Sequence, residues 1–182
     1  MEQSSETIDL NAYFQRIGYK GDRTATLKTL QAIHLCHTKS IAFKNLNSLL
    51  KQPVSLNLKS LEKKLIYEGR GGYCFEQNLL LRSVLLTLGF QVKNLAARVL
   101  WNIPEGRIMP RTHMLLCLDI DGQKYIADVG FGGITLTAPL SVIFINLSYE
   151  IIRKVNFFSS ESTYNNCSIY HLPPNYLWQY FN

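Results

Sequence analysis

The chain has 182 residues, of which 47% are hydrophobic and 12% aromatic, so it can bury a sizeable core in one domain or two small ones. Its net charge of +6 comes from dispersed lysines and arginines, which argues against a nucleic-acid partner. No run approaches the roughly 18 apolar residues of a membrane span, and the polar first six residues are unlike a signal peptide, so we expect a cytoplasmic protein without a membrane partner.

The first half of the chain carries helical patterns. Asp9 can cap a helix that runs from Leu10 to Ile17, and Gly18 would end it. Three more helices are predicted by apolar residues at helical spacing. Their faces are Leu27, Leu30 and His34 for the first, Leu58, Leu61 and Leu65 for the second, which ends near Gly69, and Leu81, Leu85 and Leu88 for the third, which runs from Cys74 to Gly89. Residues 52–57 are expected to be extended or a loop.

From Phe90 onward the pattern changes to strands, with one strand over 92–101 and a loop over 102–110. Asp121-Gly122 between two apolar runs predicts a hairpin with a type I′ turn in which Ile120 faces Gln123. Counting back from this turn places His113 opposite Gly130. His113 and Asp128 then lie on the same face of the hairpin as diagonal neighbours, close enough for an imidazole and a carboxylate to meet. A slip of one residue would separate them.

Cys74 lies where the glycine-rich Arg70-Gly71-Gly72 turn meets a long apolar helix. The first-turn N–H groups and the helix dipole stabilise a thiolate at such a position, so Cys74 is expected to ionise more readily than an ordinary cysteine. With His113 as base and Asp128 as its orienting carboxylate, the three residues predict a nucleophilic triad. Taken singly, each has a structural alternative: a buried cysteine, a strand histidine and a turn-capping aspartate.

The other cysteines and histidines suggest no further site. Cys36, Cys117 and Cys167 show no paired spacing and are expected to be free thiols in a reducing compartment. His34 and His37 lie one helical turn apart, but no further ligands are spaced to complete a site, so no metal is expected.

Several of these segments resemble the arylamine N-acetyltransferase family. The family motif Arg-Gly-Gly-x-Cys-x-Glu-x-Asn stands unbroken from Arg70 to Asn78, and Asp-Val-Gly-Phe-Gly-Gly stands at 128–133. The N-terminal residues 13–19 and His37 also fit. Family members usually read Pro-Phe-Glu-Asn at 42–45, but this chain has Ala42 and Lys44 in place of the proline and the glutamate. Any local ion pair that the family's glutamate makes is therefore in doubt here. The resemblance runs from about residue 8 to about residue 140.

The resemblance implies a ping-pong transfer of an acetyl group. Cys74 would take the acetyl group from acetyl-CoA and pass it to an arylamine, arylhydroxylamine or hydrazine, with backbone N–H groups at the helix start, including that of Phe75, holding the oxyanion. The acceptor pocket would contain Phe43, Thr112 and Phe131 by their positions in the motifs. Arg70 and Glu76 would form a structural ion pair that shapes the turn. A cysteine hydrolase or amide synthase with the same triad, and an inactive fragment, remain alternatives.

The expected fold class is α+β, with a papain-like core. A helical bundle over 1–89 would carry the nucleophile, and a partial β-barrel over 90–182 would carry the histidine and aspartate. The family also has a third, lid domain. Because residues 134–182 contain none of the eleven glycines, we expect the tail from Ser141 to be atypical, with only 178–181 resembling the last barrel strand. Our hypothesis is that the chain is a truncated or out-of-frame product that lacks this lid. Such a product would hold CoA poorly and favour hydrolysis of the acetyl-enzyme over transfer. The oligomeric state is not predicted.

Overall fold

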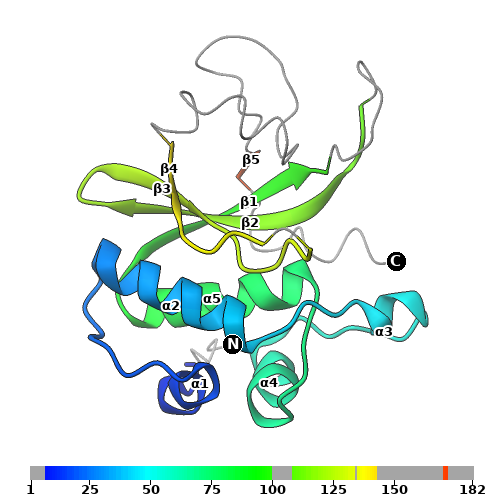
Figure 1. Ribbon diagram of the computed structural model, residues 1–182. Coiled ribbons are helices and arrows are strands. Elements are labelled where there is room, and N and C mark those ends of the chain that lie inside the picture. Colours follow the sequence, from blue (N-terminus) through cyan, green and yellow to red (C-terminus); the bar gives the residue numbers. More distant parts are fainter. Residues whose placement is uncertain (1–6, 100–107, 134, 143–169, 172–182) are drawn as a thin grey trace, which may run out of the picture.

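The structure is a computed structural model that describes residues 7–99, 108–133, 135–142 and 170–171. Helices pack against one face of a sheet, with α2 and α5 between the sheet and the pair α1 and α4 (Figure 1). The expected end of the first strand near Trp101, most of the loop 102–110, Cys167 and nearly all of the tail, including 178–181, lie outside the described residues.

The predicted helices form, and the first has the expected N-cap and terminal glycine. The helices are α1 (Leu10–Ile17), α2 (Leu27–Ser40), α3 (Leu46–Leu49), α4 (Leu58–Leu61), its π-helical continuation η1 (Glu62–Tyr67), and α5 (Cys74–Thr87). Asp9 caps α1 by accepting from the amide of Ala12 at 2.9 Å, and Gly18 ends it in the left-handed region at a φ of 68°. The sequence pattern predicted neither the short α3 nor the π-helical turn of η1.

The helix α5 is the central element of the helical layer. Its residues Leu79, Leu80, Leu81, Val84 and Leu85 are all buried, although they do not lie on one face. A helix that is apolar on several sides must be covered on several sides. Helix α4 contacts α5 from one direction and strands β1 and β2 contact it from another, so the start of α5 is held firmly against both layers.

The strands form one antiparallel sheet in the order β4-β3-β2-β1-β5. Their bounds are β1 (Gln91–Arg98), β2 (Arg111–Ile120), β3 (Gln123–Ala127), β4 (Leu140–Ser141) and β5 (Tyr170–His171). Within the described residues this sheet is open, with β4 and β5 at its two edges, so the closed part of a barrel is not seen here.

The hairpin of β2 and β3 has the predicted register. Ile120 pairs with Gln123, and the ladder continues to Leu116 opposite Ala127. Asp121 and Gly122 have φ values of 53° and 78°, as a type I′ turn requires. Because the ladder ends at Ala127, Asp128 begins the glycine-rich loop directly beside His113 of β2.

One hydrophobic cluster joins the two layers. It contains Leu30 and Ile33 of α2, Leu81 of α5, and Met114 and Leu116 of β2, each fully buried. The division of the chain at residues 89 and 90 into two domains stays a prediction, since the helices and strands share this core. Within the described ranges, every helix falls short of the length and apolarity that a membrane span requires.

Candidate active site

The Arg70-Gly71-Gly72 turn brings the chain alongside an extended segment before Cys74 begins α5. Phe43 forms a parallel bridge with Gly72, and the Gly72 amide donates to the Ala42 carbonyl at 3.3 Å. A Cβ atom at Gly71 would overlap that carbonyl oxygen, and one at Gly72 would lie 2.9 Å from the Cβ of Glu76. Both glycines are therefore needed for the close approach, which leaves Cys74 only 8% exposed at the helix start.

Glu76 supports the first turn of α5, but not through the predicted partner. Its Oε2 accepts from the Tyr73 amide at 3.1 Å, and its Oε1 pairs with the Lys64 ammonium at 2.6 Å. The predicted ion pair between Arg70 and Glu76 is wrong. Glu76 faces inward toward η1, whereas Arg70 is exposed and lies 3.6 Å from Glu68. The turn is shaped by a capping carboxylate and a lysine from the preceding helix.

His113 and Asp128 meet as the hairpin register predicts. The Nε2 atom of His113 lies 2.7 Å from Oδ2 of Asp128, and both side chains are buried. The other side of the imidazole faces Cys74, whose side chain hydrogen-bonds His113. Since Nε2 is occupied by Asp128, Nδ1 is the ring nitrogen left for the sulfur. Cys74 Sγ also lies 3.9 Å from the Thr112 carbonyl oxygen.

The electrostatics of this pair favour a charged imidazolium. Burial alone lowers the pKa of His113, but the charge and hydrogen bond of Asp128, together with the Cys74 side chain, outweigh burial and raise the pKa to about 10. Burial works to raise the pKa of Asp128, but the charge of His113 and hydrogen bonds from His113, Asn78 and Gly130 keep it below its usual value. The carboxylate is thus ionised beside a histidine that holds its proton.

Asn78 connects the nucleophile helix to the aspartate. It lies one turn after Cys74, is fully buried, and donates from Nδ2 to Asp128 at 2.9 Å and to the Met114 carbonyl at 2.8 Å. Its Oδ1 accepts from the Val129 amide at 3.1 Å. Asn78 therefore positions Asp128 relative to Cys74. The sequence analysis gave Asn78 no role, although its place in the motif four residues after Cys74 was a usable signal.

His34 is a second residue whose role was not predicted. Its Nε2 accepts from the backbone amide of Asp128 at 3.3 Å, so a helix-borne imidazole fixes the start of the glycine-rich loop. Burial lowers the pKa of His34 to about 4, which keeps its ring neutral and able to accept. The sequence placed His34 on the buried face of its helix but could not show which strand residue it would meet.

A buried chain of hydrogen bonds explains the N-terminal motif. The Tyr13 hydroxyl bonds His37 Nδ1 at 2.9 Å, His37 Nε2 bonds Gln77 Oε1 at 3.2 Å, and Gln77 donates to the Gly72 carbonyl at 2.8 Å. Arg16 donates to three backbone carbonyls, those of Ser40, Leu65 and Gly69. These bonds join α1 and α2 to the turn before Cys74.

His37 thus has a structural role in this chain of hydrogen bonds. Burial lowers its pKa to about 3. Within the described ranges, no three His, Cys, Asp or Glu side chains gather as a metal site would need. That no metal binds stays a prediction.

The Gly-Phe-Gly-Gly loop packs directly on Cys74. A Cβ at Gly130 would lie 2.7 Å from the Cα of Cys74, so only glycine allows this approach. The next residue, Phe131, meets the imidazole of His113 edge-on, with ring centroids 5.3 Å apart and planes at 88°.

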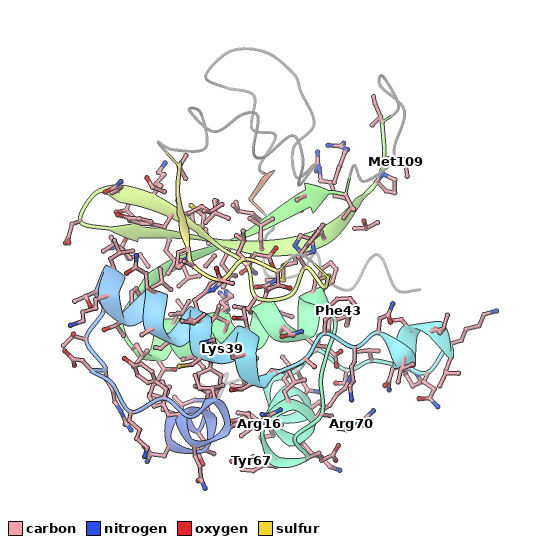
Figure 2. All side chains as sticks on the ribbon, viewed as in Figure 1. Arg16, Lys39, Phe43, Tyr67, Arg70 and Met109 are labelled. Carbon is pink, nitrogen blue, oxygen red and sulfur yellow. The ribbon has the colours of Figure 1, made fainter. Side chains whose placement is uncertain are left out.

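Two of the three residues predicted for the acceptor pocket contact the predicted triad, and the third, Phe43, contacts the glycine-rich loop. Phe43 is 40% exposed and faces Gly132, where an added Cβ atom would lie 3.5 Å from the Phe43 ring. It lies near the start of α5, on the segment between α2 and α3 (Figure 2). Phe131 contacts His113, and Thr112 presents its carbonyl to Cys74. Their role in binding an acceptor stays a prediction.

Known proteins are similar to this chain in sequence and fold. A family model described as N-acetyltransferase matches residues 26–160. The match begins later and ends later than the stretch of about 8–140 over which the motifs resemble the family. An arylamine N-acetyltransferase of Escherichia coli is 47% identical over 134 residues, covering 74% of this chain and 47% of that protein. One of Mycobacterium tuberculosis is 46% identical over 137 residues, covering 73% of this chain and 48% of that protein.

Solved structures agree with these relatives. The arylamine N-acetyltransferase from Salmonella typhimurium has a TM-score of 0.71 at 43% identity and covers 75% of this chain and 50% of its own. A Mycobacterium marinum arylamine N-acetyltransferase in complex with CoA has a TM-score of 0.70 at 43% identity, covering 74% of this chain and 51% of its own. The chain spans about half the length of the relatives it matches.

Proposed function

Because this chain belongs to the arylamine N-acetyltransferase family, we propose that it transfers an acetyl group from acetyl-CoA to an arylamine, arylhydroxylamine or hydrazine. The observation that carries the proposal is the buried arrangement in which the His113 imidazole lies between Cys74 and Asp128. This is the nucleophile, base and orienting group that acyl transfer through a thioester requires.

In the first half-reaction, Cys74 attacks the acetyl carbonyl of acetyl-CoA. The raised pKa of His113 suits its imidazole to hold the proton that Cys74 loses as the sulfur attacks. The new bond joins Cys74 Sγ to the acetyl carbon, and the bond from that carbon to the CoA sulfur breaks. The departing CoA thiolate takes the proton from His113, which leaves a neutral imidazole.

In the second half-reaction, the amine attacks the acetyl group on Cys74. His113, now neutral, accepts the proton that the amine nitrogen loses, and Cys74 leaves as a thiolate. The enzyme returns to its starting state with the acetyl group on the acceptor. The exchange of one thioester for another is nearly thermoneutral, so a weakly nucleophilic arylamine meets an activated acyl group without an uphill step.

The start of α5 supplies the electrostatic part of the mechanism. We propose that the Phe75 amide, in the first turn of α5, donates to the oxyanion of each tetrahedral intermediate. Phe131 and Thr112 would line the acceptor pocket because they contact His113 and Cys74, and Phe43 because it faces Gly132 of the adjoining loop. A relative in complex with CoA supports acetyl-CoA as the cosubstrate.

We also propose that the helices before residue 90 and the strands after it form the two halves of a papain-like core, with the sheet as part of a barrel. The location of the triad supports this, since α5 carries Cys74 and the β2 and β3 region carries His113 and Asp128. A cytoplasmic location stays a prediction from the sequence.

Release of CoA thiol tests the proposed function. The purified chain is incubated with acetyl-CoA, with and without an arylamine or hydrazine, and free thiol is measured over time. Acetyl transfer predicts sustained release that depends on the acceptor and disappears in Cys74→Ala. Release at the same rate without any acceptor would indicate a hydrolase and contradict the proposal, and so would the absence of release under all conditions.

A further inference from the structure

A cavity of about 100 Å³ lies on the outer side of the Arg-Gly-Gly turn. Its lining residues come from the segment leading into α3, from η1 and from the turn itself, and they are Lys44, Leu46, Asn47, Lys64, Arg70 and Gly71. Three of these six are cations and none is acidic. The mechanism proposed above uses none of the three cations as a reacting group.

The cations around this cavity exceed the carboxylates that could neutralise them. Lys64 is paired with Glu76 at 2.6 Å, and Arg70 lies 3.6 Å from Glu68, which Lys63 also approaches at 4.0 Å. Lys44 has no ion pair within the part of the chain that the structure describes. Its charge is therefore available to a ligand with excess negative charge.

The cavity is also held in shape by fixed contacts. Arg70 donates from Nη2 to Asn47 Oδ1 at 3.1 Å, which anchors its planar guanidinium on α3. The Lys44 amide donates to the Gly72 carbonyl at 2.9 Å, and its Cγ lies 3.0 Å from where a Gly71 Cβ would be. Gly71 thus leaves room for the lysine stem beside the turn. A preorganised arginine and two lysines around a small concave space suit a compact oxyanion.

We propose that this cavity binds a dianionic phosphate group, whose oxygens contact Lys44, Lys64 and Arg70. A dianion complements several neighbouring cations better than a monovalent anion does, and a phosphate group is compact enough for a cavity of this size. The phosphate can be inorganic or belong to a phosphate monoester. The inference does not depend on acetyl transfer, because none of its residues takes part in the triad chemistry.

Titration calorimetry on the full chain tests the site. Inorganic phosphate is added at constant ionic strength maintained with chloride, and we expect saturable binding. Lys44→Glu reverses the charge of the lysine without an ion pair and is expected to weaken binding by at least about tenfold. The matched control is Lys20→Glu, which makes the same charge change in the exposed loop between α1 and α2, on the opposite side of Figure 1 from α3. It should change the dissociation constant by less than about twofold.

Two further measurements make the result decisive. Thermal unfolding of both variants shows whether each is folded, and Lys44→Met, which removes the charge without adding a carboxylate, also has to weaken binding. Adenosine 5′-monophosphate is titrated in parallel: tighter binding than phosphate identifies a monoester as the ligand class, and equal binding identifies the phosphate group alone. Absence of saturable binding of both ligands, or equal weakening by Lys44→Glu and Lys20→Glu, would overturn the proposal.

Discussion

The start of α5 and the helix α3 both adjoin the Arg-Gly-Gly turn, yet they are built in opposite ways. Around α5, the polar side chains of Asn78, His113 and Asp128 are at most 3% exposed and bond one another. On α3, Leu49 is 72% exposed, and the following Leu50 is 62% exposed. The comparison teaches that the buried polar side chains are fixed by bonds between layers, whereas Lys44 and Arg70 on the outer side of the turn stay exposed.

Asp128→Asn is expected to have the largest effect. The substitution keeps the shape of the side chain but removes the charge that holds the proton on His113, so acetyl transfer should slow by about 10³- to 10⁴-fold. The measurement is kcat/KM for an arylamine, with thermal unfolding to show that the protein remains folded. A loss of less than about tenfold in a folded variant would show that Asp128 does not orient the base.

Asn78→Ala should have the next largest effect. The substitution leaves the Val129 amide and the Met114 carbonyl without their buried partner, and it removes one donor to Asp128. We expect a loss of about 3 kcal/mol in the free energy of unfolding, measured by urea denaturation. Ser83→Ala in the same helix is the matched control. Among the described residues its hydroxyl bonds the Leu79 carbonyl alone, so the substitution should cost less than about 0.5 kcal/mol.

The location of Asn78 also shows what the sequence could predict and what it could not. The Asp121-Gly122 turn is a local signal, and it determined the register that brings His113 to Asp128. The caps of α1 are equally local. The bonds of Asn78 and His34 to Asp128 depend on how α5 and α2 pack against the sheet, which no short pattern contains.

The incorrect prediction of an ion pair between Arg70 and Glu76 has a similar cause. The spacing of Arg70 and Glu76 puts both near one turn, but the direction of each side chain depends on where η1 lies. Lys64 of η1 reaches Glu76 on the inner side, which leaves Arg70 to Glu68 and Asn47 outside. The sequence pattern does not predict α3, because four residues are too few to show a helical period.

The pH dependence of stability sharpens the comparison further. In the folded chain His113 keeps its proton up to a pKa of about 10, whereas an unfolded histidine releases it near 6.5. Its contribution to the free energy of unfolding is therefore complete below pH 6.5 and is lost as the pH rises toward 10. Urea unfolding at several pH values in this window should show the decline, and His113→Gln should remove it. An equal decline in this variant would contradict the ion pair.

Leu49→Ser is expected to have the smallest effect, because the side chain is already exposed on α3. The free energy of unfolding should change by less than about 0.5 kcal/mol. Leu80→Ala, in the fully buried part of α5, is the contrasting variant and should cost about 2 to 5 kcal/mol. A large effect of Leu49→Ser would mean that α3 is covered in solution, which would contradict the exposure of Leu49 in the structure.

The most direct test of the central claim is the intact mass of the chain after incubation with acetyl-CoA in the absence of an acceptor. The claim is that Cys74, next to the His113 and Asp128 pair, carries the acyl group. It predicts the added mass of one acetyl group, located on the peptide that contains Cys74, absent in Cys74→Ala and removed when an arylamine is added. An acetyl group on another residue, or a chain that stays unmodified at saturating acetyl-CoA, would contradict it.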